Sequence, residues 1–472
     1  MTQPDNSDQR PIHFVGIAGA GMRALAELLA RRGVAVTGCD ANPGPTEDLA
    51  ALGISVSNGN SAEHVEGARE LIVTSAISPN HPELMRAREL GIPITKRAIA
   101  LGRAVAAGRV VGIAGTHGKT TTTVMTTAAL AAAGLKPTGI AGGRVAEWKG
   151  NLHYESDELF VVEADEYDRS FLALSPTVAV VTNVEADHLD IYRDLDDITT
   201  TFSLYVRDAA AIVLCDDDAG ARSLILPASA EIIRYGLKSR DARLVASDVR
   251  SDGHSTTFSV SYDGRALGDV ALRVPGVHNV QNALAAIGSG FALGATLDSM
   301  RDGFLQFGGV DRRFQRLYDI GGVTIVDDYA HHPTEIAATL QAARASYPGR
   351  RIVAAFQPHL FSRTRDFSAA FGAALCGADC VFLAEIYPAR EQPIPGITSE
   401  LVASSMKLAG RAVIWQGARS DLADALAPFV MPGDVVITIG AGDITRTGPE
   451  LKTRLEVRNS NIDLKARSDG RK

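Results

Sequence analysis

The 472-residue sequence has few cysteines, few aromatic residues and no long apolar run. It contains four cysteines, and aromatic side chains make up 6% of its residues. Four thiols are too few for a disulfide framework in a chain of this length, which favours a reducing compartment. Cys376 and Cys380 lie four positions apart, but no further Cys or His follows them at a zinc-finger spacing.

The sequence also lacks an excess of positive charge. Lys and Arg total 47 against 55 Asp and Glu, a net charge of -8, which argues against nucleic-acid binding. The sequence contains no stretch of about 18 apolar residues, so we predict no membrane span. The first ten residues do not resemble a signal peptide. We expect a cytoplasmic enzyme, monomeric or homodimeric, that acts on small molecules.

Hydrophobic residues make up 46% of the chain and glycine is abundant, a mixture typical of α/β layers packed through small side chains. At about 150 residues per domain, the length predicts about three domains. The first block alternates strands and helices, with an apolar strand at 12–17, a helix at 22–32 and further strands at 71–73 and 92–94. This alternation predicts a parallel sheet with crossover helices.

Two further blocks follow the first. The second has expected strands at 110–114, 159–162, 178–181 and 211–214, and the third at 323–326, 352–356, 380–383 and 435–439. We therefore predict an α/β protein of three domains with mostly parallel sheets, over residues 1–106, 107–313 and 314–472. From Thr453 the chain is polar and charged, and we expect a frayed or mobile tail.

The strongest chemical signal is a glycine-containing loop between an apolar strand and a helical segment. Successive backbone amides in such a loop can converge on phosphate oxygens. Lys119 would face the β- and γ-phosphates of ATP, and the Thr120 hydroxyl would bind Mg²⁺. The predicted ATP-binding loop comprises Gly115, Thr116, His117, Gly118, Lys119, Thr120 and Thr121.

One position departs from the general phosphate-loop pattern. Ile113 stands where that pattern has glycine, five residues before Gly118. The alternative interpretation is an ordinary strand-to-helix turn with a solvated lysine. The order of strand, glycines, Lys-Thr and helix favours the phosphate loop.

An earlier glycine-rich turn resembles a dinucleotide-binding fingerprint, although its order is G-x-x-G-x-G. Asp40 follows at the end of the next strand, where an acidic residue binds a ribose hydroxyl in such folds. The ligand could be NAD, which would make the chain an oxidoreductase, or a UDP-sugar, and a turn that only packs is a third possibility. We assign this substrate site to Gly19, Ala20, Gly21, Met22, Asp40 and Ser75.

Acidic and histidine residues follow two successive strands of the second block. Glu163, Asp165, Glu166 and Asp168 come directly after one strand, and a segment containing Asp187, His188 and Asp190 follows the next. Carboxylates at the ends of parallel strands face the crevice that binds ligands. Glu163 is the first candidate for Mg²⁺, His188 is a candidate for a divalent ion or the transferred phosphoryl group, and the three aspartates Asp168, Asp187 and Asp190 are interpreted as structural.

The third block begins with two more polar clusters. Arg312 and Arg313 lie at the boundary, where an arginine could reach the γ-phosphate, or simply be solvated. Asp327 to Pro333 follow a strand and include groups able to hold a ribose or orient an amine.

Together these motifs resemble those of the Mur ligase family of peptidoglycan synthesis. The resemblance runs from about His13 to Ile444 and is carried by the segments 16–22, 115–121, 163–166, 183–190, 278–286, 312–315 and 328–333. It implies a three-domain ligase. The Rossmann-like first domain would bind a UDP-sugar, and the second, a parallel-sheet domain of the P-loop ATPase type, would bind ATP. The Rossmann-like third domain would help bind the nucleotide and an amino acid.

The resemblance also implies roles for single residues. Glu163 and His188 would hold magnesium, and Asn279 and Asn282 would face the adenine. Arg313 would contact phosphate and Asp328 the ribose. His331 and His332 would lie near the incoming amino acid. With Lys119, the residues Glu163, His188 and Arg313 form the expected catalytic set.

One departure from the family concerns a lysine. Several members carry a carbamylated lysine some fifteen residues after the magnesium histidine, whereas no lysine lies between His188 and Lys238 here. This absence favours the branch that adds L-alanine to the lactyl carboxylate of UDP-N-acetylmuramate through an acyl phosphate. A ligase that recycles a muropeptide tripeptide onto the same UDP-sugar is the nearest alternative, and a non-catalytic nucleotide-binding regulator is a more distant one.

Overall fold

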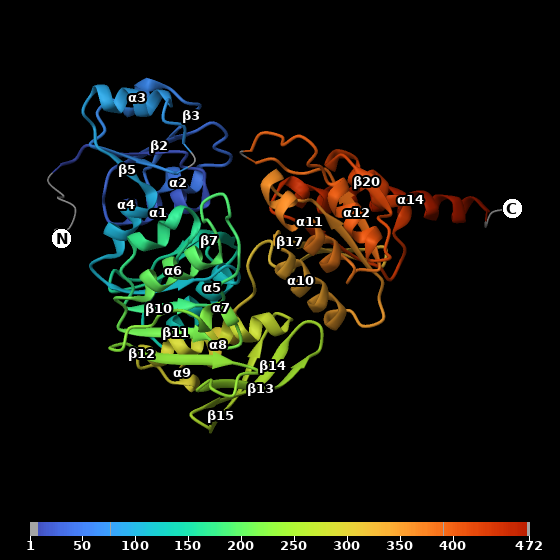
Figure 1. Ribbon diagram of the computed structural model, residues 1–472. Coiled ribbons are helices and arrows are strands. Elements are labelled where there is room, and N and C mark those ends of the chain that lie inside the picture. Colours follow the sequence, from blue (N-terminus) through green and yellow to red (C-terminus); the bar gives the residue numbers. More distant parts are fainter. Residues whose placement is uncertain (1–7, 76, 390, 470–472) are drawn as a thin grey trace. The chain divides into compact units, whose positions relative to one another are not determined.

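The computed structural model describes residues 8–75, 77–389 and 391–469. These residues form three sheets of five, ten and six strands with helices between the strands (Figure 1). The sheets are mostly parallel, which confirms the predicted α/β fold with three sheet-containing domains. By internal contacts the chain divides into two compact units. The first ends at Val310 and holds the first two sheets, and the second holds the third sheet together with the short segments Arg250–Thr256 and Val274–His278.

The first sheet has the order β3-β2-β1-β4-β5, and all its strands are parallel. The order reverses beside the central strand β1, so the carboxyl end of β1 lies at a switch point, where ligands bind such sheets. The elements are β1 (Ile12–Val15), α1 (Ala20–Arg31), β2 (Val36–Asp40), α2 (Glu47–Ala51), β3 (Ser55–Asn58), η1 (Ala62–Val65), β4 (Glu70–Val73), α3 (Pro82–Glu89), β5 (Ile94–Lys96) and α4 (Arg97–Val105).

The second sheet has the order β15-β14-β13-β12-β11-β10-β6-β9-β7-β8, with β6 between β10 and β9. Its elements are β6 (Arg109–Ala114), α5 (Lys119–Ala132), β7 (Thr138–Val145), β8 (Gly150–His153), β9 (Leu159–Glu163), η2 (Tyr167–Ala173), β10 (Val178–Val181), α6 (Leu195–Val206), β11 (Ala211–Cys215), α7 (Ala219–Arg222), β12 (Glu231–Gly236), β13 (Leu244–Ser251), β14 (Thr256–Tyr262), β15 (Arg265–Leu272), α8 (Val277–Ala292) and α9 (Leu297–Gln306). Strands β10, β6 and β9 run parallel, so their carboxyl ends meet at one edge.

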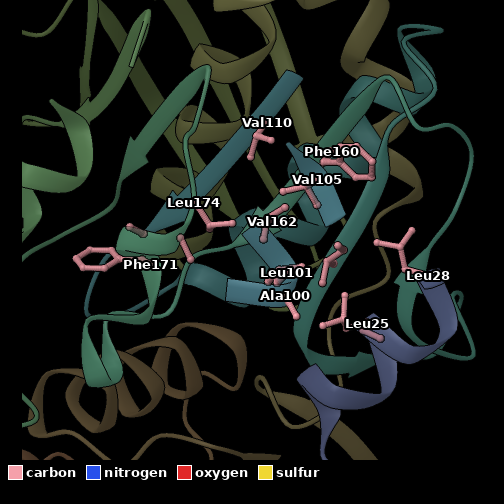
Figure 2. Close-up of a cluster of buried hydrophobic side chains, with 14 of the residues drawn as sticks. Leu25, Leu28, Ala100, Leu101, Val105, Val110, Phe160, Val162, Phe171 and Leu174 are labelled. Carbon is pink, nitrogen blue, oxygen red and sulfur yellow. The ribbon is translucent and has the colours of Figure 1, made fainter. Parts of the chain in front are cut away.

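The first two sheets share one hydrophobic core (Figure 2). Leu25 and Leu28 of α1 belong to the same buried cluster as Leu101 of α4 and Phe160 and Val162 of β9. Helix α4 follows the last strand of the first sheet and leads into β6, and its apolar side chains bury themselves against the second sheet. This shared core explains why both sheets belong to one compact unit.

The third sheet has the order β16-β17-β21-β18-β19-β20, parallel except for the edge strand β16. Apolar clusters lie against its central strands. The elements are β16 (Gln315–Ile320), β17 (Val323–Asp328), α10 (Pro333–Ser346), β18 (Ile352–Phe356), α11 (Phe361–Leu375), β19 (Cys380–Ala384), α12 (Glu400–Leu408), β20 (Trp415–Gly417), η3 (Arg419–Asp421), α13 (Leu422–Phe429), β21 (Val435–Ile439), η4 (Asp443–Arg446) and α14 (Thr447–Asp469).

The structure corrects the expectation of a frayed or mobile tail from Thr453. Helix α14 continues through Thr453 to Asp469. Leu451 and Leu455 are fully buried in the core of the third sheet, and this anchor lets the polar remainder continue as helix. Within the described residues, we find no helix that combines the length and apolarity needed to cross a membrane.

Candidate active site

The predicted phosphate loop joins β6 to α5. Two of its glycines adopt positive φ, +140° at Gly115 and +80° at Gly118, and α5 begins directly afterwards at Lys119. A side chain would be strained at both positions. The loop therefore adopts the strand–turn–helix geometry in which backbone amides at a helix N-terminus face an anion.

The end of β10 holds this loop in place. Asn183 Oδ1 accepts the backbone N–H of His117 at 2.7 Å, and Thr182 Oγ1 donates to the His117 carbonyl at 2.6 Å. The Thr116 hydroxyl in turn accepts the backbone N–H of Glu185 at 2.9 Å. The ends of two neighbouring strands are thus tied together, as their positions in a parallel sheet predict.

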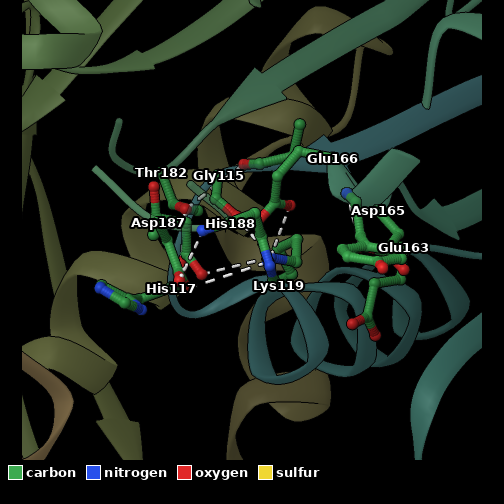
Figure 3. Close-up of polar contacts among 12 residues, drawn as sticks. Gly115, His117, Lys119, Glu163, Asp165, Glu166, Thr182, Asp187 and His188 are labelled. Atoms are coloured by element: carbon green, nitrogen blue, oxygen red, sulfur yellow. Dashed lines mark hydrogen bonds and ion pairs between the residues drawn. The ribbon is translucent and has the colours of Figure 1, made fainter. Parts of the chain in front are cut away.

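The Lys119 ammonium lies at the centre of the site (Figure 3). Its Nζ donates to the Gly115 carbonyl at 2.7 Å and lies 2.7 Å from Glu166 Oε2. Burial acts to lower the pKa of Lys119, but Glu166 and the neighbouring carboxylates outweigh it and raise that pKa. Burial acts to raise the pKa of Glu166, but Lys119 and His188 lower it. The pair is therefore held in its charged form.

Glu166 is the functional candidate that the sequence interpretation missed. Glu163 ends β9 and three acidic residues follow it, Asp165, Glu166 and Asp168. Nothing in their residue types separates Glu166 from the others. The structure separates them, because Glu166 is 3% exposed and lies between Lys119 and His188, whose Nε2 is 3.5 Å from Glu166 Oε1. The Glu166 backbone carbonyl also accepts the Tyr192 hydroxyl at 2.6 Å.

The two predicted magnesium residues contact different partners. Glu163 Oε1 accepts the Thr120 hydroxyl at 3.0 Å, and Glu163 Oε2 accepts the backbone N–H of Gly142. His188 contacts Glu166, and its ring packs edge-on against Tyr167. The hydroxyl and carboxylate oxygens of Thr120 and Glu163 are the donors that a hard cation prefers, so these residues fit Mg²⁺. The imidazole of His188 is a less typical ligand for that ion.

Asn279 and Asn282, predicted to face an adenine, lie on α8 beside the phosphate loop. Asn282 Oδ1 accepts the Thr122 hydroxyl at 3.1 Å, and Asn282 Nδ2 donates to Asn279 Oδ1 at 3.2 Å. Both side chains are 7% exposed. A Cβ at Gly118 would lie 2.7 Å from Asn282 Oδ1, a second reason for glycine at that position.

The first glycine turn is bound to the end of β2. Asp40 Oδ2 accepts the backbone N–H of Ala18 at 3.1 Å, and Asp40 Oδ1 accepts that of Asn42 at 2.9 Å. Gly19 is the N-cap of α1, followed by Ala20, Gly21 and Met22 in its first turn. Asp40 therefore shapes the turn, whatever ligand the turn binds.

Ser75 connects the first two domains. Its hydroxyl donates to Asp168 Oδ2 at 2.6 Å, and Lys96 Nζ lies 2.9 Å from the same oxygen. The hydrogen bond from Ser75 is the largest influence that lowers the pKa of Asp168, and Lys96 adds to it. Asp168 adopts a positive φ of 55°, so its backbone departs from the helical conformation within η2.

The remaining predicted residues belong to the second compact unit. Asp328 ends β17, is 7% exposed, and accepts the backbone N–H groups of Phe314 and Ala330 at 2.8 and 2.7 Å. Burial raises the pKa of Asp328 to about 6. Arg313 lies 3.5 Å from Glu335 and over the Tyr329 ring.

The two neighbouring histidines are placed differently. His331 Nδ1 lies 3.2 Å from Glu335 and 3.1 Å from the Tyr329 carbonyl. His332 is the N-cap of α10, 5% exposed, and its ring packs against Phe367. Arg312 has a structural role, because its side chain contacts Asp327 and donates to the Gly440 carbonyl.

The fold and the loop geometry define an α/β protein with a phosphate loop at the carboxyl edge of its central sheet. Family models match almost the whole chain: "Mur ligase family, catalytic domain" over residues 11–109, "Mur ligase middle domain" over 113–290, and "Mur ligase, glutamate ligase domain" over 312–442. The chain belongs to the Mur ligase family.

Curated relatives extend the similarity over nearly the full length. A protein from Salinibacter ruber named UDP-N-acetylmuramate–L-alanine ligase is 42% identical over 461 residues, which cover 96% of this chain and 97% of that protein. One of the same name from Acidothermus cellulolyticus is 43% identical over 438 residues, covering 91% of each chain.

Solved structures show the same fold. The crystal structure of a UDP-N-acetylmuramate–alanine ligase from Thermotoga maritima matches with a TM-score of 0.80 and 29% identity, over 95% of this chain and 100% of that chain. A murein peptide ligase from Psychrobacter arcticus matches with a TM-score of 0.69 and 24% identity, over 94% and 98% of the two chains. The second likeness concerns the fold alone.

Proposed function

We propose that this chain is an ATP-dependent ligase that joins L-alanine to the lactyl carboxylate of UDP-N-acetylmuramate in peptidoglycan precursor synthesis. The observation that carries the proposal is the similarity, over 96% of the chain, to a protein named for that reaction. The buried ion pair between Lys119 of the phosphate loop and Glu166 supports it, because the reaction consumes ATP.

The chemistry requires the carboxylate to be activated, since oxide is not a leaving group. A lactyl carboxylate oxygen attacks the γ-phosphorus of ATP, the bond from that phosphorus to the β–γ bridging oxygen breaks, and ADP leaves with the bond electrons. The alanine amine then attacks the acyl carbon, the carbon–oxygen bond to phosphate breaks, and the amine loses a proton. The products are an amide, ADP and phosphate.

The charged Lys119 suits the first step. Two anions must approach each other, and a buried, protonated ammonium offsets their repulsion. We propose that Thr120, Glu163 and His188 hold magnesium, which would neutralise further phosphate charge when bound. The backbone amides of Gly115 to Thr121 would hold the phosphates.

The other site residues complete the proposal. The first glycine turn, with Asp40 and Ser75, would bind the UDP-sugar, and Asn279 and Asn282 would flank the adenine. In the second unit, Asp328 would bind the ribose, Arg313 a phosphate, and His331 and His332 the amino acid. Because its substrates are ATP and a UDP-sugar, we place the reaction in the cytoplasm.

A recycling ligase for a muropeptide tripeptide is the second candidate within the family. The names of the 42–43% identical relatives favour the L-alanine branch.

The test is phosphate release from Mg-ATP and UDP-N-acetylmuramate with L-alanine, other amino acids, the tripeptide, or no acceptor. We expect release that depends on L-alanine and is lost in Lys119→Ala. Release with the tripeptide but not with L-alanine would assign the recycling reaction instead. ATP binding without acceptor-dependent release would leave a nucleotide-binding regulator.

A further inference from the structure

A second cluster of metal-ligating side chains lies in the first domain, away from the phosphate loop. His13 on β1, Cys39 on β2 and Glu83 on α3 each direct one potential ligand atom inward, and these atoms lie within 4.8 Å of one another. The three residues are 1%, 0% and 0% exposed. They come from three separate elements of the first domain, of which β2 and α3 are labelled in Figure 1.

The geometry of the cluster leaves a nitrogen aimed at its centre. His13 Nδ1 lies 2.9 Å from the Thr37 hydroxyl, which fixes the ring so that Nε2 faces Glu83. Nε2 is 3.5 Å from Glu83 Oε2, and the His13 ring helps to lower the pKa of that carboxyl. Cys39 Sγ lies 3.0 Å from the same carboxylate oxygen.

A fourth donor is adjacent. His64 Nδ1, from η1, lies 3.0 Å from Glu83 Oε1, and the two histidine rings are 6.3 Å apart. His64 therefore orients the carboxylate and places a further nitrogen donor beside the cluster. Three or four nitrogen, sulfur and oxygen donors within a few ångströms match the coordination number of a tetrahedral site.

The donor chemistry selects the class of ion. A thiolate and imidazoles bind Zn²⁺ or a similar borderline ion, whereas Mg²⁺ prefers oxygen ligands. One thiolate and one carboxylate carry two negative charges, which a divalent ion balances. A buried site of zero net charge avoids the penalty of an uncompensated buried charge.

We propose that His13, Cys39 and Glu83, with His64 as the adjacent donor, form a structural site for Zn²⁺ or a similar thiophilic divalent cation. The site is separate from the magnesium residues proposed at the phosphate loop. Its effect would reach the first glycine turn, because the Cys39 carbonyl accepts the backbone N–H groups of Gly16 and Ile17 at 2.8 and 3.0 Å. A bound ion would fix β1, β2 and α3 to one another.

Metal binding at this cluster is coupled to proton release. Burial raises the pKa of the Cys39 thiol, and the hydrogen bond to Glu83 raises it further. The thiol proton must leave when the sulfur binds an ion, so the affinity for Zn²⁺ increases with pH.

The experiment titrates the full-length, chelator-treated protein with Zn²⁺ against a chromophoric chelator and, separately, with Co²⁺ followed by absorption. Cys39→Ser removes the sulfur ligand. Cys215→Ser is the matched control, because Cys215 is also a buried strand cysteine but lies in the second sheet and outside the cluster. The titrations are repeated with Mg-ATP present to exclude binding at the phosphate loop.

We expect one Zn²⁺ per chain, retained in Mg-ATP, and a thiolate-to-cobalt charge-transfer band. Cys39→Ser should weaken Zn²⁺ binding about 100-fold and lose the band, and Cys215→Ser should keep both. Absence of Zn²⁺ binding by the wild-type protein, or equal binding by Cys39→Ser, would overturn the proposal.

If Cys39→Ser does not fold, X-ray absorption of the zinc-loaded wild-type protein decides the question. A sulfur neighbour at about 2.3 Å supports the site. A shell of nitrogen and oxygen alone rejects it.

Discussion

At the scale of single residues, the charge of Lys119 depends on its partner. The ammonium is buried, and burial alone would lower its pKa, so the phosphate loop requires a nearby carboxylate to keep the lysine protonated. Glu166 supplies that carboxylate at 2.7 Å. We interpret Glu166 as a positioning residue that acts through Lys119.

Glu166→Gln should lower kcat about 100-fold and shift the alkaline limb of the pH–rate profile to lower pH. The pKa of Lys119 is raised by Glu166, so the lysine loses its proton at a lower pH once that charge is removed. The matched control is Glu158→Gln, because Glu158 is an exposed glutamate directly before β9, the strand that precedes Glu166. An unmoved alkaline limb in Glu166→Gln would show that Glu166 does not set the charge of Lys119.

Asp328 gives a prediction for stability. Its folded-state pKa of about 6 exceeds the ordinary value of 3.8, so the stability that it contributes is present below pH 3.8 and is lost as the pH rises through 6. The loss amounts to at most about 3 kcal/mol. Asp328→Asn has no such titration, so its stability relative to the wild type should improve between pH 4 and pH 7.

Urea unfolding at those two pH values measures this difference. The chain has two tryptophans, and in a Trp148→Phe background the fluorescence of Trp415 on β20 reports the second unit alone. A stability difference that is the same at both pH values would contradict the raised pKa of Asp328.

At the scale of elements, the glycine turn between β1 and α1 is held by the end of β2 through Asp40. The sequence predicted Asp40 as a ligand of the substrate ribose, whereas the structure shows that one of its oxygens already accepts the Ala18 amide. Bracing the turn and binding the ligand make different demands on the side chain. Bracing the turn at Ala18 needs one acceptor oxygen, because the other oxygen accepts the Asn42 amide outside the turn. Ribose binding in such folds uses a carboxylate.

Asp40→Ala should raise the KM for UDP-N-acetylmuramate about tenfold, the value of one hydrogen bond, and leave the KM for ATP unchanged. Asp40→Asn keeps an acceptor oxygen and should restore most of the affinity. Steady-state kinetics with each substrate varied separately measures both effects, and exposed Asp208→Ala serves as the control. Equal losses in the Ala and Asn variants would show that the carboxylate charge matters and would reject the bracing role.

The elements also show what could be predicted from the sequence. Apolar runs with clear ends predicted β10, β18 and β21 with their observed bounds, because strands buried on both faces leave an unbroken apolar signal. Strands β13 and β15 were not predicted, since Leu244–Ser251 and Arg265–Leu272 mix polar and small residues. Their pairing with neighbouring strands at one end of the second sheet makes them strands.

The residues of the candidate site likewise divide into those that the sequence predicts and those that it does not. Lys119 and Thr120 could be found because their order after a strand and before a helix is informative. Glu166 could not, because its role depends on the path of the loop after β9, where Asp168 and Arg169 adopt positive φ. The cluster of His13, Cys39 and Glu83 was also invisible, since its members are 26 and 44 positions apart and meet only through β1–β2 pairing and the packing of α3.

At the scale of the whole molecule, the family places the three sheets in a fixed order along the chain. We propose that the first compact unit carries the groups for the UDP-sugar and most of the groups for ATP, while the groups assigned to the amino acid belong to the second. The proposed reaction also has two stages, because the acyl phosphate forms before the amine of the amino acid is needed.

This division predicts partial chemistry without the third substrate. With ATP labelled at the β–γ bridging oxygen and UDP-N-acetylmuramate present, reversible phosphoryl transfer should scramble the label into the β non-bridging positions in the absence of L-alanine. Exchange is followed by ³¹P NMR, and hydroxylamine should trap the activated lactyl group as a hydroxamate. Lys119→Ala should abolish both signals, since the lysine stabilises the charge that develops in this first step. If exchange and hydroxamate were both absent while L-alanine-dependent turnover remained normal, the prediction that the acyl phosphate forms before L-alanine binds would be wrong.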